Sequence, residues 1–219
     1  MPRVPERITP QQFHDADGVE DWREVGAGVC AYFRTGSFAT GVALVVRIGA
    51  LADAANHHPD VDLRYPGLTV RLITHEVGGL SDRDVDLARQ ISAAARELDA
   101  TADPSEVQTV QLTIDAATTA DVRPFWRAVL GYKEVGDEDV VDPHGRNPSI
   151  WFQGLDAPRP QRNRMQIDVF VPPELAAARI AAAVDAGGRV VDDSHAPSWV
   201  VLADPEGNEV CVATWMGRD

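Results

Sequence analysis

The second half of the chain repeats itself, and this internal repeat constrains the fold more than any other feature of the sequence. Gln111 and Gln166 lie 55 residues apart, and Gly131 and Gly187 lie 56 residues apart, at the ends of two helical patterns. Each copy begins with a strand pattern, continues with a helix and ends in further short strands. The repeat therefore predicts two βαβββ units in tandem over about 107–214.

The first half predicts an α+β domain over residues 1–100, with helices covering an antiparallel sheet. Apolar residues recur at helical spacing from Phe38 to about Asn56, and Pro59 requires this helix to end at or just before His58. The other main predicted elements are strands at 22–25, 29–34 and 68–74 and a helix from Ser81 to about Leu98.

A polar segment that contains a proline, residues 99–106, separates the two halves and is typical of a domain boundary. We therefore expect one domain at 1–100, a linker at 101–106 and a second domain at 107–219.

Composition excludes several classes of partner. The formal charge is −14, and both halves are acidic, which disfavours binding to nucleic-acid phosphates or to anionic lipid. No apolar run approaches the ~20 residues of a membrane helix. The first residues have no apolar core of the secretory type, and the two distant cysteines, Cys30 and Cys211, suit a reducing compartment. These features predict a cytoplasmic protein that acts on a small molecule.

Three of the six histidines gather in one region of the sequence. His57 and His58 follow a predicted helix, and His75 follows a predicted strand 18 positions beyond His57. Imidazole is the usual side chain for proton transfer near neutral pH. Asp53 precedes His57 by four positions, so we expect both on one helical face, where the carboxylate would orient the imidazole. The cluster predicts an acid/base site at the edge of the sheet.

The histidines have two other interpretations. They can be surface or helix-capping residues, or three histidines can bind zinc. Adjacent histidines tend to point apart, and no H-x-x-x-H or H-x-x-E-H pattern accompanies them. We therefore favour acid/base chemistry and expect no metal.

The order of motifs over about residues 6–98 resembles the pterin-4a-carbinolamine dehydratase family. The motifs are Asp53-x-x-x-His57-His58-Pro59, then Tyr65, then Leu72-Ile-Thr-His75-Glu-Val-Gly-Gly-Leu80-Ser-Asp-Arg-Asp84. The resemblance implies a four-stranded antiparallel sheet with helices on one face. It implies a hydro-lyase, a 4a-hydroxytetrahydrobiopterin dehydratase, whose substrate is the pterin carbinolamine. It also implies that no metal or other cofactor is used and that the protein is a homodimer or homotetramer.

The resemblance assigns site residues. Those it places in catalysis are His57, His58, His75 and Asp53, and those it places against the pterin are His57, His58, Pro59, Thr74, His75, Glu76 and Val77. Asp84 matches a family aspartate and can equally cap a helix. Because dehydration needs an acid for the departing hydroxide and a base for a ring proton, we favour His57 and His75 as that pair. Trp22 and Phe38 can line a pterin pocket or pack in the core.

The repeat at about 107–214 resembles the glyoxalase/bleomycin-resistance (vicinal oxygen chelate) superfamily. Leu202-Ala-Asp-Pro-Glu-Gly-Asn-Glu-Val-Cys-Val212 and Phe125-Trp-Arg-Ala-Val-Leu-Gly131 carry this resemblance. Catalytic members hold a divalent metal with His and Glu, whereas this chain has Gln111, Gln166 and Cys211 at three of those positions. Amides are poor ligands for transition metals and one thiol cannot complete a site, so we expect no metal here.

Three functions remain open at this stage. The leading hypothesis is a dehydratase of tetrahydropterin recycling that is fused to a metal-free glyoxalase-like domain. The alternative is a small-ligand-binding or interaction protein in which the glyoxalase-like domain carries the main role. The third is a metal enzyme with ligands elsewhere in 107–214. Four tryptophans could line a ligand site there or pack in the core: Trp126, Trp151, Trp199 and Trp215.

Overall fold

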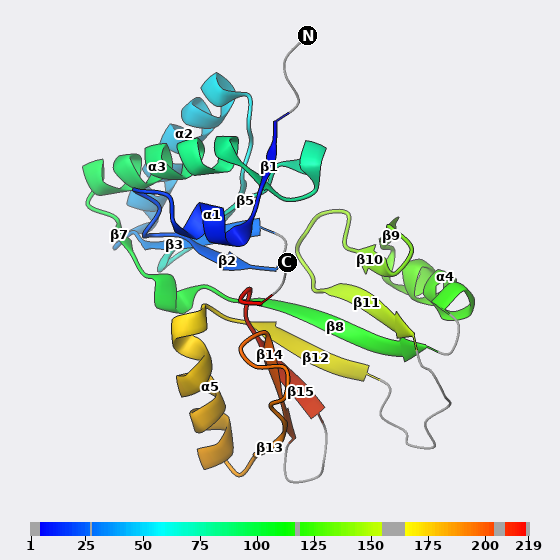
Figure 1. Ribbon diagram of the computed structural model, residues 1–219. Helices are drawn as coiled ribbons and strands as arrows, with labels where there is room; N and C mark the ends of the chain where they lie inside the picture. The colour runs from blue at the N-terminus through cyan, green and yellow to red at the C-terminus, as the bar shows by residue number, and fades with distance from the viewer. Residues whose placement is uncertain (1–4, 27, 117–118, 155–164, 204–208, 218–219) are drawn as a thin grey trace. The chain divides into compact units, whose positions relative to one another are not determined.

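The computed structural model divides the chain into two compact units, 1–107 (unit 1) and 108–217 (unit 2) (Figure 1). The residues that it describes are 5–26, 28–116, 119–154, 165–203 and 209–217. Each unit has its own sheet and its own helices.

Unit 1 combines an antiparallel sheet with two long helices. Its elements are β1 (Arg7–Ile8), α1 (Pro10–His14), β2 (Arg23–Val25), β3 (Gly28–Arg34), α2 (Phe38–Ala55), β4 (Asp60–Arg64), β5 (Gly67–Leu72), the 3-10 turn η1 (His75–Val77), β6 (Leu80–Ser81), α3 (Asp82–Glu97), β7 (Thr101–Ala102) and η2 (Pro104–Glu106). The sheet has the order β2-β3-β5-β4, and β1 pairs separately with β6. The helix predicted from Phe38 ends at Ala55, as Pro59 requires.

The expected linker at 101–106 is part of the fold of unit 1. β7 pairs antiparallel with β3 and adds a fifth strand to the four expected. Arg34 of β3 holds the segment against the sheet, because its guanidinium lies 2.7 Å from Asp103 Oδ2 and 2.8 Å from Glu106 Oε1. The backbone N–H of Asp103 also donates to the carbonyl of Tyr32 at 2.8 Å. The polar composition of this segment therefore reflects ion pairing with the sheet.

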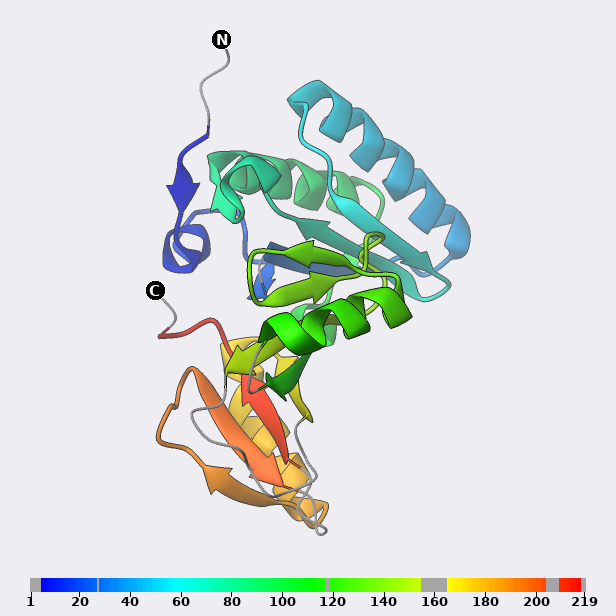
Figure 2. The ribbon, with the colours of Figure 1, turned by 90° about the vertical axis from the view of Figure 1, so that its right-hand side faces the viewer.

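The core of unit 1 lies between the sheet and the helix pair α2 and α3, which cover the same face (Figure 2). Alternate residues of β3 and β5 point into it, as the period of a strand requires. The six are Val29, Ala31, Phe33, Leu68, Val70 and Leu72, all with no exposed surface. Gly41 lets α2 approach the sheet, since a Cβ there would lie 2.5 Å from Leu63 Cδ1.

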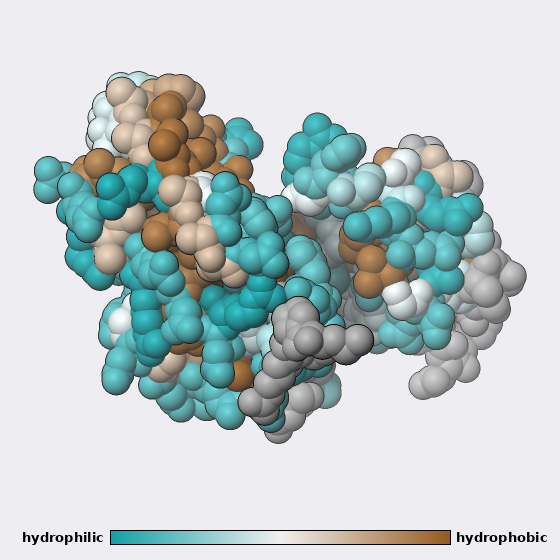
Figure 3. Space-filling view, turned by 90° about the horizontal axis from the view of Figure 1, so that it is seen from above, coloured by the Kyte–Doolittle hydropathy of each residue, from teal (hydrophilic) through white to brown (hydrophobic). Residues whose placement is uncertain are grey.

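The outward face of α2 is also apolar. Phe38, Val42 and Val46 are 50%, 43% and 66% exposed and follow each other at intervals of one helical turn. They belong to an apolar patch over α2 (Figure 3). By length and composition α2 would also suit a membrane span. Its inner residues Leu44 and Ile48 are packed in the core, as in the core helix of a globular domain.

Glu24 is the buried acidic group of β2. It lies opposite Val29, and within the described chain its Oε2 atom is buried with no hydrogen-bond partner. Burial raises the pKa of Glu24 to about 7 from its ordinary value of 4.5. The folded state therefore binds this proton more tightly than the unfolded state, so the ionised group destabilises the fold.

We expect Glu24→Gln to stabilise unit 1 in a pH-dependent way. Wild-type stability should fall as the pH rises from 4.5 through 7, and the variant should lose that slope. The gain should reach about 1 kcal/mol above pH 8, once the partial exposure of the group is allowed for, and should vanish near pH 4. Urea midpoints measured from pH 4 to pH 9 test this, and parallel profiles for the two proteins would contradict it.

The described residues of unit 2 form one eight-stranded sheet and two helices. Its elements are β8 (Thr109–Ala116), α4 (Thr119–Leu130), β9 (Lys133–Val135), β10 (Asp139–Val141), β11 (Ser149–Gly154), β12 (Met165–Phe170), α5 (Pro173–Asp185), β13 (Arg189–Asp192), β14 (Trp199–Ala203) and β15 (Glu209–Ala213). Each half thus has the order βαβββ. The sheet runs β13-β14-β15-β12-β8-β11-β10-β9, so the first strands of the two halves pair at its centre.

Both helices of unit 2 cover the same face of the sheet. α4 packs over a cluster that contains Ile114 and Phe152, and α5 packs over one that contains Val171 and Val212. Because side chains alternate along a strand, Thr113 and its neighbours two residues away lie on the other face, which neither helix covers.

Candidate active site

The end of α2 determines where the first two histidines lie. Asn56 adopts the left-handed conformation with φ 47° and ψ 43°, which asparagine tolerates better than most residues. The backbone N–H groups of Asn56 and His57 then donate to the carbonyls of Asp53 at 3.2 Å and Ala52 at 3.1 Å. This turn closes the helix and leads His57 away from the helical path.

His57 is buried against an aspartate from another helix. Its Nε2 atom lies 2.8 Å from Oδ1 of Asp84, in the first turn of α3. The side chains of His57 and Asp84 are 5% and 0% exposed. A carboxylate buried to this degree is costly unless its oxygens are bonded, so the rest of its environment matters.

Asp84 satisfies its second oxygen with groups from two elements. Oδ2 accepts from the Ser81 backbone N–H at 2.8 Å and from the Thr74 hydroxyl at 2.6 Å. The hydroxyls of Thr74 and Ser81 lie 2.7 Å apart. The predicted cap is confirmed, since Ser81 and Asp84 form a reciprocal capping box. The sequence analysis did not foresee that Asp84 also binds His57, 27 positions away.

The expected pairing of Asp53 with His57 is wrong. Asp53 Oδ1 lies 3.1 Å from Nε2 of His58, and these side chains are 82% and 60% exposed. The helical spacing that motivated the expectation ends at Asn56, whose left-handed turn carries His57 toward α3. Asp53 and His58 form a solvent-exposed pair, which contributes little to stability.

His75 opens the short turn η1, directly after the buried Thr74. It is exposed, and Glu76 beside it accepts a hydrogen bond from Arg83 Nη1 at 3.0 Å. The pKa of Glu76 lies below its ordinary value, because the carboxylate accepts from its own backbone N–H and from Arg83. The chain of contacts His57–Asp84–Thr74 thus leads to the segment that carries His75.

The arrangement can move protons. In the tautomer with a proton on His57 Nε2, this nitrogen donates to Asp84 Oδ1. The other ring nitrogen, Nδ1, is then the one able to take a proton from a ligand. An exposed second imidazole, His75, supplies a complementary acid or base.

Two aromatic residues considered for the pocket lie elsewhere. Trp22 is 2% exposed in the core, and its indole N–H donates to Ser92 Oγ at 3.1 Å. Phe38 begins α2, at the opposite end of that helix from His57, and is half exposed. Core packing is therefore confirmed for Trp22, whereas Phe38 belongs to the outward face of α2.

In unit 2 the strand register places three polar residues side by side. Asp168 of β12 pairs with Gln111 of β8 on one side and with Cys211 of β15 on the other. The Thr113 hydroxyl donates to Asp168 Oδ2 at 2.6 Å. The sequence analysis missed Asp168, which the register between repeats could have indicated. Gln166 pairs with Thr113 in the backbone, and its side chain lies outside the described set.

Among the residues that the structure describes, no three His, Cys, Asp or Glu side chains gather closely enough to hold a metal.

The four tryptophans of unit 2 differ in their surroundings. Trp126 packs on the core beneath α4, whereas Trp151 pairs with Thr113 on the uncovered face of the sheet. Trp199 stacks on His195 at 4.3 Å, and Trp215 is half-buried.

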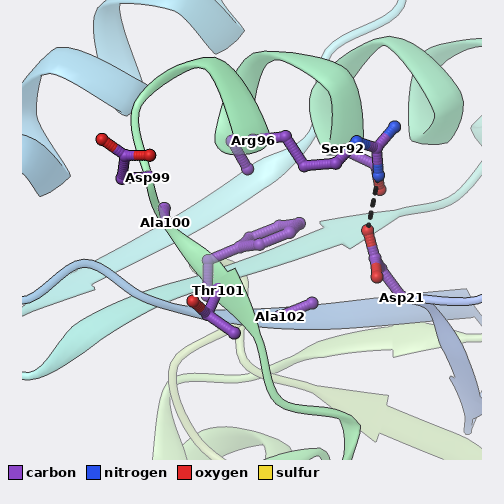
Figure 4. Close-up of a pocket in the computed structure, with 9 residues that line it drawn as sticks. Asp21, Ser92, Arg96, Asp99, Ala100, Thr101 and Ala102 are labelled. Atoms are coloured by element: carbon purple, nitrogen blue, oxygen red, sulfur yellow. Dashed lines mark hydrogen bonds and ion pairs between the residues drawn. The ribbon is translucent and has the colours of Figure 1, made fainter.

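A cavity of about 400 Å³ lies at the other end of α3 (Figure 4). Phe33 and small side chains such as Ala95 and Ala100 line it. Arg96 and Asp21 at its border lie 3.4 Å apart. It contains no histidine, so it lacks the acid/base groups gathered at the start of α3.

Comparison with known proteins divides the chain at the same place. The family Pterin 4 alpha carbinolamine dehydratase matches residues 6–94, and the family Glyoxalase-like domain matches residues 111–213. A protein of Nocardia farcinica, provisionally named pterin-4-alpha-carbinolamine dehydratase, is 45% identical over 76 residues, which are 35% of this chain and 80% of that protein. A Chloroflexus aurantiacus protein of the same name is 36% identical over 91 residues, 42% of this chain and 95% of its own.

A solved structure, the transcriptional coactivator/pterin dehydratase from Brucella melitensis, aligns with 41% of this chain and 99% of its own length. The sequence identity is 25% and the TM-score is 0.39. On the sequence matches, the chain belongs to the pterin-4-alpha-carbinolamine dehydratase family through its first unit and carries a glyoxalase-like domain in its second.

The two carboxylate–histidine pairs should differ sharply in their effect on stability. We expect Asp84→Ala to destabilise unit 1 by about 3 kcal/mol, because it leaves buried donors of Thr74, Ser81 and His57 without an acceptor. Asp53→Ala, which removes the exposed pair, should cost less than about 0.5 kcal/mol. Urea titration, with hydrogen exchange in α3 reporting on unit 1, measures both. Equal effects would contradict the assignment of Asp84 as the structural centre of the site.

Proposed function

We propose that unit 1 dehydrates 4a-hydroxytetrahydropterin to quinonoid dihydropterin, as a step of tetrahydropterin recycling. The observation that carries the proposal is the buried pair of His57 and Asp84, linked through Thr74 to the segment that bears His75. Membership of the dehydratase family supports the same reaction.

The proposed chemistry consists of proton transfers around one bond cleavage. The lone pair of ring nitrogen N5 expels the hydroxyl from C4a, so that the C4a–O bond breaks and a C4a–N5 double bond forms. An acid protonates the departing oxygen, and a base removes a proton from a ring nitrogen, which releases one water in total. No electron acceptor enters this balance, and we invoke no metal or other cofactor.

We assign the base to His57 and the acid to His75. Asp84 holds the proton on His57 Nε2, which leaves Nδ1 as the accepting nitrogen. His75 is exposed and can donate to a leaving hydroxide. His58, with Asp53, is assigned to binding and support at the exposed border of the site.

The remaining pterin contacts are assigned to Pro59, His75, Glu76 and Val77, which are partly or fully exposed. Thr74 is different, because it has no exposed surface and its hydroxyl serves Asp84. We therefore propose that Thr74 supports the site through Asp84 and does not touch the pterin with its side chain.

We expect His57→Ala and His75→Ala each to lower the dehydration rate by about 10²–10⁴-fold, because each removes a proton-transfer group. Stopped-flow absorbance of 4a-hydroxytetrahydropterin decay, with the full chain, is the measurement. Gln111→Ala and Cys211→Ala in unit 2 serve as controls and should keep the wild-type rate. A rate that is insensitive to both histidine substitutions would refute the proposed chemistry.

We also propose that the protein is a homodimer or homotetramer that uses α2. The apolar stripe of Phe38, Val42 and Val46 covers two helical turns of a strongly acidic chain and would be excluded from water by a second copy of the same helix.

Val46→Glu should weaken this assembly, because it places a charge in the centre of the stripe. Sedimentation velocity should show a smaller species for the variant than for the wild type at equal concentration. Val184→Glu, at an exposed apolar residue of α5 in unit 2, is the matched control. A wild-type protein that sediments as a monomer would exclude the interface.

A second candidate function is ligand binding by unit 2. Thr113, Asp168 and Trp151 are positioned on the sheet face that its helices leave uncovered. If the intact chain fails to accelerate dehydration, this face becomes the place to search for a ligand. Metal analysis of the purified protein tests the third possibility, which stoichiometric zinc, iron or nickel bound in residues 107–214 would support. We place the protein in the cytoplasm.

A further inference from the structure

One arginine connects the three segments that form the histidine site. Arg83 is in the first turn of α3, next to Asp84, and its side chain is 29% exposed. Nη1 donates to Glu76 Oε1 at 3.0 Å, and Nη2 donates to the backbone carbonyl of Asn56. A single guanidinium thus bridges η1 and the end of α2.

Each contact of Arg83 lies one residue from a group of the proposed mechanism. Asn56 immediately precedes His57, and Glu76 immediately follows His75. Within the described chain, the hydrogen bond that Glu76 accepts from Arg83 is the only side-chain hydrogen bond between η1 and another element. The buried network of Asp84 fixes His57 and, through Thr74, the start of the turn that carries His75. Arg83 connects the exposed part of that turn to α3 through Glu76.

We propose that Arg83 is a positioning residue that holds the turn of His75 against the turn of His57 and His58. This inference rests on the proposed dehydratase function. An arginine guanidinium is a hydrogen-bond donor and is neither the acid nor the base of the proposed reaction. Its role is to keep the two imidazoles at the spacing that the reaction needs, and a misplacement of about 1 Å can cost about 10²-fold in rate.

The chemistry of the bridge explains why arginine is required. Its planar fork presents two donors in fixed directions, so it can reach a carboxylate and a carbonyl at the same time. A lysine has one compact ammonium on a flexible chain and can replace the contact to Glu76 but not both contacts. In the ion pair of Arg83 and Glu76, the Glu76 side chain is 55% exposed. Removal of this pair should therefore change the free energy of unfolding little.

The chain offers a matched control for the loss of an ion pair. Arg47 of α2 and Glu97 of α3 lie 2.7 Å apart and also join two elements at the surface of unit 1. Neither residue contacts the histidine segments through any described bond. Arg47→Gln therefore removes a comparable arginine without touching the site.

The experiment measures kcat and KM for dehydration by stopped flow with the full chain, together with the thermal midpoint of each variant. We expect Arg83→Gln to lower kcat by about 10–100-fold with a change in KM below about 3-fold, since positioning acts in the transition state. Arg83→Lys should recover part of kcat. Arg47→Gln should keep wild-type kcat, and its thermal midpoint should match that of Arg83→Gln.

A double-mutant cycle with Glu76→Ala separates positioning from direct contact with the pterin. If Arg83 acts through Glu76, the kcat of the double variant should equal that of Arg83→Gln, because both changes break the same bridge, whereas the pterin contact proposed for Glu76 affects KM. Additive losses in kcat, or an Arg83→Gln variant with a raised KM and an unchanged kcat, would overturn the proposal. A wild-type kcat in the Arg83→Gln variant would also overturn the proposal.

Two outcomes keep this test separate from the proposed function. A wild-type chain that does not accelerate dehydration refutes the dehydratase itself, whereas an active wild type with an equally active Arg83→Gln refutes only the role of Arg83. If Arg83→Gln does not fold, Glu76→Ala removes the same bridge from its exposed end. An unchanged kcat in that variant would then overturn the inference.

Discussion

The bond between His57 and Asp84 is the interaction on which the structure of the first unit depends. A buried carboxylate is tolerated only when its oxygens are bonded, and Asp84 meets this requirement with groups from three elements. It caps α3 through Ser81, binds the end of β5 through Thr74 and fixes the imidazole that follows α2. The start of one helix, the end of another and the end of a strand are therefore coupled at a single carboxylate. That coupling gives His57 a defined ring orientation, which proton transfer needs.

The two units distribute their polar groups in different ways. Unit 1 concentrates histidines and carboxylates at one end of its sheet, partly buried and partly exposed. Unit 2 has polar side chains on the sheet face opposite its helices, where the buried Thr113 binds Asp168, and its described residues form no cluster for a metal. The family matches cover these halves separately, at 6–94 and 111–213. The proposed dehydration therefore uses residues of unit 1 alone.

The surface of unit 1 combines a strongly acidic chain with an apolar helix face. Charge keeps such a protein dispersed, whereas a stripe such as Phe38, Val42 and Val46 favours association. α2 therefore has two roles: its inner residues Leu44 and Ile48 stabilise the core, and its outer residues remain available to a partner. The same helix ends in the turn that carries His57 and His58, so the core position of α2 also positions the site.

The sequence by itself determined the division into two halves, the βαβββ order of the second and the extent of α2, and it singled out the three histidines of the candidate site, because periodicity, proline and motif order are local properties. It did not determine which carboxylate serves which histidine. Helical spacing favoured Asp53 for His57, but the left-handed turn at Asn56 sends His57 to Asp84 of α3. Likewise, the polar composition of segment 101–106 predicts a linker, whereas in the structure Arg34 of β3 binds this segment to the sheet. Only the tertiary structure decided these points, because each depends on contact between residues 27 or more positions apart, which no local pattern encodes.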